Sequence, residues 1–297
     1  MIHLLALLGV LSISFSAVFV RLAAVSPVTA AFFRAVYALP ILAVLWLVVR
    51  KRDARSTRAR LLAAVSGVFL AIDLGFWHAS IASIGVGLAT VIANVQVVFV
   101  AIAGWILYRE KPTPRAMLII AGVLAGIVLS SGLAQRDAYG AAPVTGAVLS
   151  VLAGAFYCVY LLMFRRANRQ LAPASGPLLD ATIGATIGAL ACSVFDPKFS
   201  LDPSFPAHGW LILLALVSQV VGWLCIGRAL PRLPALETSI LLLVQPVFAI
   251  LWGELFFREH LSTLQWTGAG LVLSGVVFVS WKPGGLITHD LPATVTD

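Results

Sequence analysis

The sequence predicts an all-α polytopic membrane protein with ten transmembrane helices, built from two inverted five-helix repeats. Composition, the length of the apolar segments and an internal repeat lead to this prediction. The chain has 297 residues, of which 61% are hydrophobic and 11% are charged. A soluble globular protein is about 45–50% apolar and about 25% charged. Buried helices of a soluble protein are the alternative, but they would not produce so many apolar runs without an amphipathic face between them.

Ten apolar segments follow one another along the chain. Each is close to the roughly 20 residues that an α-helix needs to cross the hydrocarbon. The segments must be helices, because lipid cannot satisfy free backbone groups. The expected spans cover residues 2–24, 27–49, 61–82, 85–107, 116–133, 144–164, 175–195, 208–230, 235–256 and 264–281.

Two stretches of the chain resemble each other. Residues 95–110 read VQVVFVAIAGWILYRE, and residues 244–259 read VQPVFAILWGELFFRE, with seven of sixteen positions identical. The same offset also pairs Val123 with Val272 and Gly126 with Gly275. This pattern indicates an internal repeat. We expect a first five-helix repeat over residues 1–138, a second over 139–283, and a disordered cytoplasmic tail over 284–297.

Each repeat contains five spans, so the second repeat enters the membrane in the opposite sense. Such inverted repeats are common among secondary transporters. The loop RKRDARSTRAR carries six basic residues and, by the positive-inside rule, is expected in the cytoplasm. That side then holds 15 of the 20 Lys and Arg residues, and both termini. The net charge of +8 therefore requires no nucleic-acid partner.

Uncharged polar side chains gather near the predicted midplane, and the first is the serine pair of the first span. A polar group at this depth is costly unless it faces protein or water, so the set predicts a hydrated central cavity. Packing between helices is the alternative, above all for the serines. The expected substrate-binding residues are Ser14, Ser16, Tyr37, Asp73, Trp77, His78, Gln96, Tyr157, Tyr160, Gln219, Trp223 and Gln245.

Aromatic residues accompany these polar groups at helical spacing. Tyr157 and Tyr160 are three residues apart, and Gln219 and Trp223 are four apart, so each pair should share a helix face. Such a lining would suit a ligand with an aromatic side chain and a zwitterionic head. Trp and Tyr also serve as ordinary anchors at membrane interfaces.

Arg34 and Asp73 lie at similar depth in neighbouring spans. We expect a structural ion pair, because buried charges usually require a partner. The alternative is that Arg34 attracts a substrate carboxylate. His78 would either be hydrogen-bonded or bind substrate and change its protonation.

Prolines and glycines mark expected bends. A Pro within a span frees a carbonyl and favours a kink. We expect structural or gating roles for Arg34, Pro40, Gly104, Pro246 and Gly253. The three cysteines and five histidines show no metal-ligand spacing, so neither a metal nor a cofactor is expected.

The chain resembles the bacterial drug/metabolite transporter superfamily, EamA type. FFRAVYALPIL, HASIASIGVGLATVIANVQVVF, REKPTPRAMLIIAGVLAGIVL and REHLSTLQWTGAGLVLSGVVF carry the resemblance, which covers nearly the whole chain. Where the family often has a Trp-Gly pair in its first span, this chain has ISFS. Within the superfamily it looks most like the YddG-type exporters of aromatic amino acids.

The resemblance and the repeat together predict a secondary transporter of the bacterial inner membrane, which exports amino acids by alternating access. A bilayer and a small-molecule substrate are the expected partners, with a homodimer through the fifth and tenth spans as a further possibility. An exporter of other metabolites, nucleotide sugars or cationic drugs is the alternative. A membrane-embedded enzyme fits less well, because the sequence contains neither H-E-x-x-H nor G-x-S-x-G.

Overall fold

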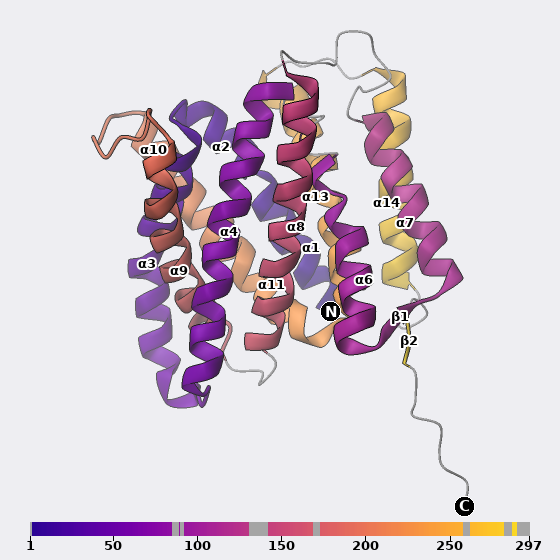
Figure 1. Cartoon of the computed structure of the whole chain (residues 1–297), viewed down its shortest axis with the longest axis horizontal. Coiled ribbons are helices and arrows are strands. Elements are labelled where there is room, and N and C mark those ends of the chain that lie inside the picture. Colours follow the sequence, from indigo (N-terminus) through magenta and orange to yellow (C-terminus); the bar gives the residue numbers. More distant parts are fainter. Residues whose placement is uncertain are drawn as a thin grey trace, which may run out of the picture.

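The computed structural model confirms a helical protein whose apolar helices suit a bilayer (Figure 1). It describes residues 2–84, 89, 92–130, 142–168, 173–257, 262–281 and 287–289. Within these residues, six helical stretches are long and apolar enough to cross a membrane: Ile2–Ala23, Pro27–Arg52, Thr57–Ser80, Val144–Ala167, Ser175–Phe195 and Ala207–Arg232. Shorter apolar helices cover Gln96–Tyr108 and Pro114–Gly126. The count of ten spans stays a prediction, because parts of the expected fourth and fifth spans lie outside the described residues.

The elements follow one another in two groups. The first comprises α1 (Ile2–Ser14), α2 (Ser16–Ala23), α3 (Pro27–Val49), η1 (Arg50–Arg52), α4 (Thr57–Ile84), α6 (Gln96–Tyr108), β1 (Glu110–Pro112) and α7 (Pro114–Ser130). The second begins with α8 (Pro143–Ala167), α9 (Ser175–Cys192), η2 (Ser193–Phe195), α10 (Ala207–Leu213), the π-helix η3 (Leu214–Gly222) and α11 (Trp223–Ala229). It ends with η4 (Leu230–Arg232), α12 (Ala235–Leu242), α13 (Val244–Phe257), α14 (Thr263–Trp281) and β2 (Ile287–His289).

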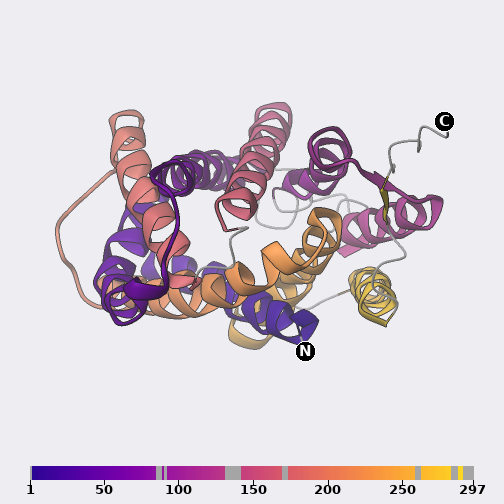
Figure 2. The same cartoon turned by 90° about the horizontal axis from the view of Figure 1, so that it is seen from below.

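The helices form a bundle with a central group between two flanks (Figures 1 and 2). On one flank, α4 packs along α9, and α9 along α3. On the other, α7 packs along α14. The main hydrophobic core lies between them and is built from α1, α8, α11 and α12, among others.

The start of α3 is fixed by its own sequence. Ser26 is the N-cap, and its hydroxyl group accepts a hydrogen bond from the Thr29 backbone N–H at 3.3 Å. Pro27 occupies the first turn, where a missing N–H costs nothing. The cap sets the register of the helix, and Arg34 comes two turns later on its buried face.

Three apolar segments are broken near their middle. The first breaks at Phe15, between α1 and α2, where the Ser14 hydroxyl group donates to the backbone carbonyl of Leu11. Such bonds to the preceding turn compete with regular helix geometry and bend helices. A second break precedes α6 at Asn94 and Val95, and a third separates α12 from α13 at Leu243.

A buried ionic cluster joins the loop after η1 to the start of α9. Arg55 donates to both carboxylate oxygens of Asp53, at 2.7 and 2.8 Å, and lies 2.8 Å from the Asp180 carboxylate. Trp46 also donates to Asp53, at 2.9 Å. These hydrogen bonds, chiefly those from Arg55, lower the pKa of Asp53 to about 2. The cluster ties the first half of the chain to the second at one end of the bundle.

The predicted tail contains one short structured element. Ile287–His289 form β2, which pairs antiparallel with β1. The remainder of residues 284–297 lies outside the described part of the chain.

Candidate functional site

A buried cavity of about 100 Å³ lies at the centre of the bundle, where the broken helices meet the continuous ones. Its walls come from α1, α2, α3, α4, α6, α8, α11 and α13. Seven of the twelve predicted substrate-binding residues line it: Ser16, Asp73, Trp77, Gln96, Tyr157, Trp223 and Gln245. Arg34, predicted as structural, lines it as well. The seven predicted residues, chosen by depth and by helical spacing, come from six helices and line one space.

The two repeat-related glutamines reach the cavity because each lies beside a helix break. Gln96 is the first residue of α6, and Gln245 is the second residue of α13. Before α6 the chain makes a tight turn, in which the Val97 and Val98 N–H groups donate to Asn94 and Val95. The first turns of both helices therefore line the cavity.

The break before α6 is packed closely against α8. A Cβ atom added at Gly154 would lie 2.5 Å from the Ala93 carbonyl oxygen and 3.3 Å from the Gln96 nitrogen. Only a glycine allows this approach, and Gly154 itself lines the cavity. The close packing at this wall of the cavity therefore requires a glycine at position 154.

Arg34 is held by a short relay of buried polar groups. Its Nε donates to Oε1 of Gln219 at 2.8 Å, and Nε2 of Gln219 donates to Oγ1 of Thr182 at 3.2 Å. Gln219 lies in the π-helix η3, whose wider i→i+5 turns are frequent at functional sites. The relay fixes the orientation of the guanidinium group and uses only one of its three nitrogens, Nε, as a hydrogen-bond donor.

The expected ion pair between Arg34 and Asp73 was wrong. Among the described residues, no nitrogen of Arg34 lies within the 4.0 Å ion-pair distance of the Asp73 carboxylate. Similar depth did not suffice, because the relay directs the guanidinium group toward Gln219. Asp73 forms no hydrogen bond and no ion pair within the described part of the chain, although only 8% of it is exposed. Arg34 and Asp73 therefore line one cavity without an ion pair between them.

The other five predicted residues belong to the surroundings of the cavity, beginning with Ser14, Tyr37 and His78. The Ser14 hydroxyl group accepts a hydrogen bond from Trp252 at 2.8 Å. The hydroxyl group of Tyr37 lies 2.6 Å from Nδ1 of His208. His78 lies 3.1 Å from the Pro27 carbonyl oxygen, which agrees with the hydrogen-bonded alternative.

Gln219 is hydrogen-bonded to Arg34 and does not line the cavity, whereas Trp223 lines it. Their spacing of four residues predicted a common face of an α-helix. That common face stays a prediction: the stretch is the π-helix η3 up to Gly222 and α11 from Trp223, and residues four apart lie close to one face in both helix types.

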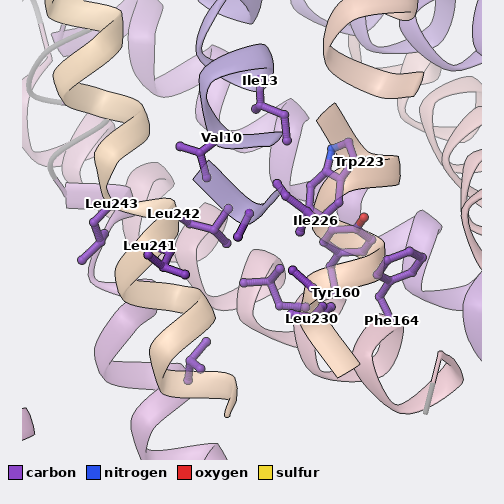
Figure 3. Packing of buried hydrophobic residues seen from close by; sticks show 14 of the residues in the cluster. Val10, Ile13, Tyr160, Phe164, Trp223, Ile226, Leu230, Leu241, Leu242 and Leu243 are labelled. Carbon is purple, nitrogen blue, oxygen red and sulfur yellow. The ribbon is translucent and has the colours of Figure 1, made fainter. Parts of the chain in front are cut away.

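Tyr160 closes one side of the cavity. It lies at 4.9 Å from Trp223, ring centre to ring centre, in an edge-to-face arrangement, and it stacks on Phe164. Figure 3 shows these rings beside Ile226 and Leu230, with Leu241 across from them. All of these side chains are buried, so the space between the cavity and this end of the bundle is filled.

Three buried polar atoms near the cavity have no hydrogen-bond partner among the residues that the structure describes: Oγ of Ser16, the hydroxyl group of Tyr160 and Nε1 of Trp223. Their residues are 4%, 0% and 2% exposed. Unsatisfied buried polar atoms are rare, and each requires an explanation. Ser16 and Trp223 line the cavity, where a polar ligand would supply the missing partner.

The four predicted hinge positions differ in their surroundings. Pro40 lies within the continuous helix α3, so it does not interrupt the second span as expected. Pro246 falls in the first turn of α13, where proline is tolerated, directly after the break at Leu243. Gly104 is buried in α6, and Gly253 lies within α13.

Sequence reasoning missed Asn94 and Thr182. Asn94 lines the cavity at the break before α6, and Thr182 supports Gln219. Asn is a poor residue for helix interiors and favours helix starts, so its place two residues before Gln96 was an available signal. Within the described residues, no group of three His, Cys, Asp or Glu side chains is placed to hold a metal ion.

Comparison with known proteins identifies the family to which this architecture belongs. The sequence model of the EamA-like transporter family matches residues 1–132 and 144–281. The chain belongs to the EamA-like transporter family. As a member of this family it is a multi-pass transmembrane transporter, whose partners are the bilayer and a small-molecule substrate. The resemblance to the drug/metabolite transporter superfamily is confirmed.

Relatives of this EamA-like transporter agree with that assignment. An uncharacterized transporter of Archaeoglobus fulgidus is 27% identical over 198 residues, which is 66% of this chain and 68% of the relative. The threonine/homoserine exporter RhtA of Escherichia coli is 27% identical over 135 residues, or 44% of this chain and 43% of RhtA. A crystal structure with 15% identity shares the fold at a TM-score of 0.78, covering 94% of this chain and 98% of its own.

Proposed function

We propose that this EamA-like transporter is a secondary transporter that exports amino acids, both aromatic and other small amphiphilic ones. The observation that carries the proposal is the buried central cavity, which combines Arg34 and Asp73 with the aromatic residues Trp77, Tyr157 and Trp223. Charged groups are costly at this depth in a membrane and usually mark a substrate or ion pathway. The similarity to RhtA, which is named a threonine/homoserine exporter, favours amino acids among the possible cargoes.

The proposed mechanism is alternating access between two inverted repeats. The two segments that the family model matches agree with repeats over residues 1–138 and 139–283, with five spans in each. The proposed axis relates Gln96 to Gln245, and both lie at helix breaks beside the cavity. Rocking of one group of helices would then expose the cavity to either face.

The proposed location is the bacterial cytoplasmic (inner) membrane, with both termini in the cytoplasm. The excess of Lys and Arg on one side of the expected spans supports this orientation. A homodimer through α7 and α14 is part of the proposal. These helices form one flank of the bundle and expose apolar side chains such as Leu118 and Phe278.

Export of a cationic compound is the second candidate. Asp73 favours it, because a carboxylate with no partner among the described residues would attract a cation. Replacing Asp73 with Asn should then abolish transport of the cation. Retained transport would exclude this candidate.

The test of the proposed function is counterflow into proteoliposomes that contain the purified protein. Labelled Phe, Trp, Thr, Met, Lys and Glu would be offered with and without a pH gradient. Saturable exchange of one or more amino acids is the expected result. If a well-folded protein exchanges none of them, the proposal is wrong, and the panel would be extended to drugs and other metabolites.

A further inference from the structure

We propose that Arg34 and Asp73 recognise the two charges of one zwitterionic head group. Arg34 binds the α-carboxylate and Asp73 binds the α-ammonium group. This inference rests on the proposed function, which it deepens by assigning an orientation to the amino acid in the cavity. It starts from the finding that these two side chains line the same cavity without forming an ion pair with each other.

The positive end of the cavity is built around Arg34, which is 7% exposed. The hydrogen bond to Gln219 uses Nε, so both Nη groups are without a partner within the described residues. A guanidinium group held in this way presents a planar fork that matches a carboxylate. All these features favour an anionic group at this end.

The negative end is the Asp73 carboxylate on α4. A buried charge is normally compensated by a partner, and breaking a compensated pair is strongly unfavourable. Arg34 is more than 4.0 Å away and therefore does not satisfy Asp73 directly. An ammonium group between them would satisfy Asp73, while the attached carboxylate satisfies Arg34. A neutral ligand with separated charges therefore compensates both ends without adding net charge to the membrane interior.

Two donors that have no partner within the described residues belong to side chains that line the cavity, and they favour a polar head group. They are the hydroxyl group of Ser16 and Nε1–H of Trp223, each belonging to a residue more than nine-tenths buried. Both groups can donate to carboxylate oxygens, and the Ser16 hydroxyl group can also accept from an ammonium group. The side chain of the ligand would then contact the aromatic part of the wall, which is formed by Trp77 and Tyr157.

The proposal predicts a sharp dependence on the ligand's charges. A ligand such as phenylalanine or threonine carries both charges, its amide keeps only the ammonium group, and its N-acetyl derivative keeps only the carboxylate. Each single-charge analogue leaves one buried charge of the protein uncompensated. We expect both analogues to bind at least tenfold more weakly than the amino acid.

The experiment measures ligand binding by thermal shift in detergent and exchange by counterflow in proteoliposomes. The proteins are the wild type, Asp73→Asn and Arg34→Gln. Each variant should lose at least tenfold affinity for the amino acid. Asp73→Asn should now bind the N-acetyl derivative about as well as the amino acid, and Arg34→Gln should do the same for the amide. This crossed pattern identifies which charge each residue recognises.

Matched controls separate recognition from folding. Asp202→Asn and Arg58→Gln remove the same charges at exposed positions and should leave all affinities unchanged. Asp73→Glu and Arg34→Lys keep the charges and should retain the preference for the zwitterion. Should Arg34→Gln fail to fold, Asp73→Asn and the comparison of the three ligands on the wild type still test the inference.

The outcomes distinguish this inference from the proposed function. If the wild type binds all three ligands equally, or if both variants weaken all three by one factor, the charges are structural and the inference is wrong. Zwitterion binding with the crossed pattern but no exchange of any amino acid would refute the transport function alone. If no amino acid is bound or exchanged, both proposals fail.

Discussion

The guanidinium group of Arg34 is directed by its hydrogen bond to Gln219, and Gln219 is in turn held by Thr182. Counting residues from the ends of the spans was sufficient to predict that Arg34 and Asp73 lie at a similar depth in the membrane. It gives no information on rotation about the helix axis or on competing hydrogen bonds. The ion pair was therefore expected, although the structure gives Arg34 an uncharged partner. For the same reason, depth brought seven residues into the cavity and left Ser14, Tyr37 and Tyr160 beside it.

Replacing Gln219 with Leu should weaken the binding of substrate by Arg34, and therefore transport. A hydrogen bond to a charged group contributes about 1.5–3 kcal/mol, and about 1.4 kcal/mol corresponds to a factor of ten. We expect KM for the exported amino acid to rise about tenfold or more, with the fold preserved. Gln219→Glu should be more harmful, because it gives Arg34 a permanent carboxylate partner. Unchanged counterflow kinetics in both variants would show that the relay has no part in binding.

The Asp53 carboxylate makes stability depend on pH. Its folded pKa of about 2 lies below the ordinary value of 3.8 for an aspartate, so its stabilising effect is complete above about pH 4 and is lost as the pH falls toward 2. The shift corresponds to about 2 kcal/mol. In detergent, the wild type should unfold at a higher temperature than Asp53→Asn at pH 6. This difference should shrink between pH 4 and pH 2. A difference that is constant over this range would contradict the assigned pKa.

At the scale of the element, the broken helices determine where the site forms. Pro246 and the repeat offset were visible signals of a discontinuity near Gln245, and the structure places the break at Leu243. The π-helix η3 had no comparable signal, because its residues LALVSQVVG read as an ordinary apolar helix. It places Gln219 against Arg34 and Thr182, and these contacts between helices could not be predicted from the spacing within one segment.

Gly154→Ala should disturb the break before α6. The added Cβ atom would lie 2.5 Å from the Ala93 carbonyl oxygen, so the backbone at the cavity wall must move. We expect a lower unfolding temperature and a loss of exchange activity of about tenfold, since small displacements of binding groups are costly.

Gly122→Ala in α7 is the matched control, because its added Cβ would meet nothing within 4 Å. In a helix, Ala is favoured over Gly by about 1 kcal/mol, so this variant should be as stable as the wild type or slightly more so. Equal behaviour of the two variants would show that the close approach of α8 is unimportant.

At the scale of the whole molecule, composition and span length were sufficient for the fold class, because a bilayer admits few backbone arrangements. They could not define which end of the cavity is closed. The structure fills the space beside Tyr160, Trp223 and Leu230 with buried side chains (Figure 3). Opening toward that end of the bundle would require α1, α8 and α11 to separate. This movement is the one that alternating access predicts.

The most direct test of the central claim is substrate protection of a cysteine placed in the cavity. Cys158, Cys192 and Cys225 would be replaced by Ala, and Tyr157→Cys introduced on the cavity wall. Ser204→Cys, at an exposed position of the loop before α10, would be the control. A transported amino acid should slow the reaction of the Tyr157→Cys thiol with a small thiol reagent, at the concentrations that half-saturate exchange, and leave the control unaffected. A reaction rate that does not depend on substrate, in a protein that still exchanges it, would contradict the assignment of this cavity as the transport site.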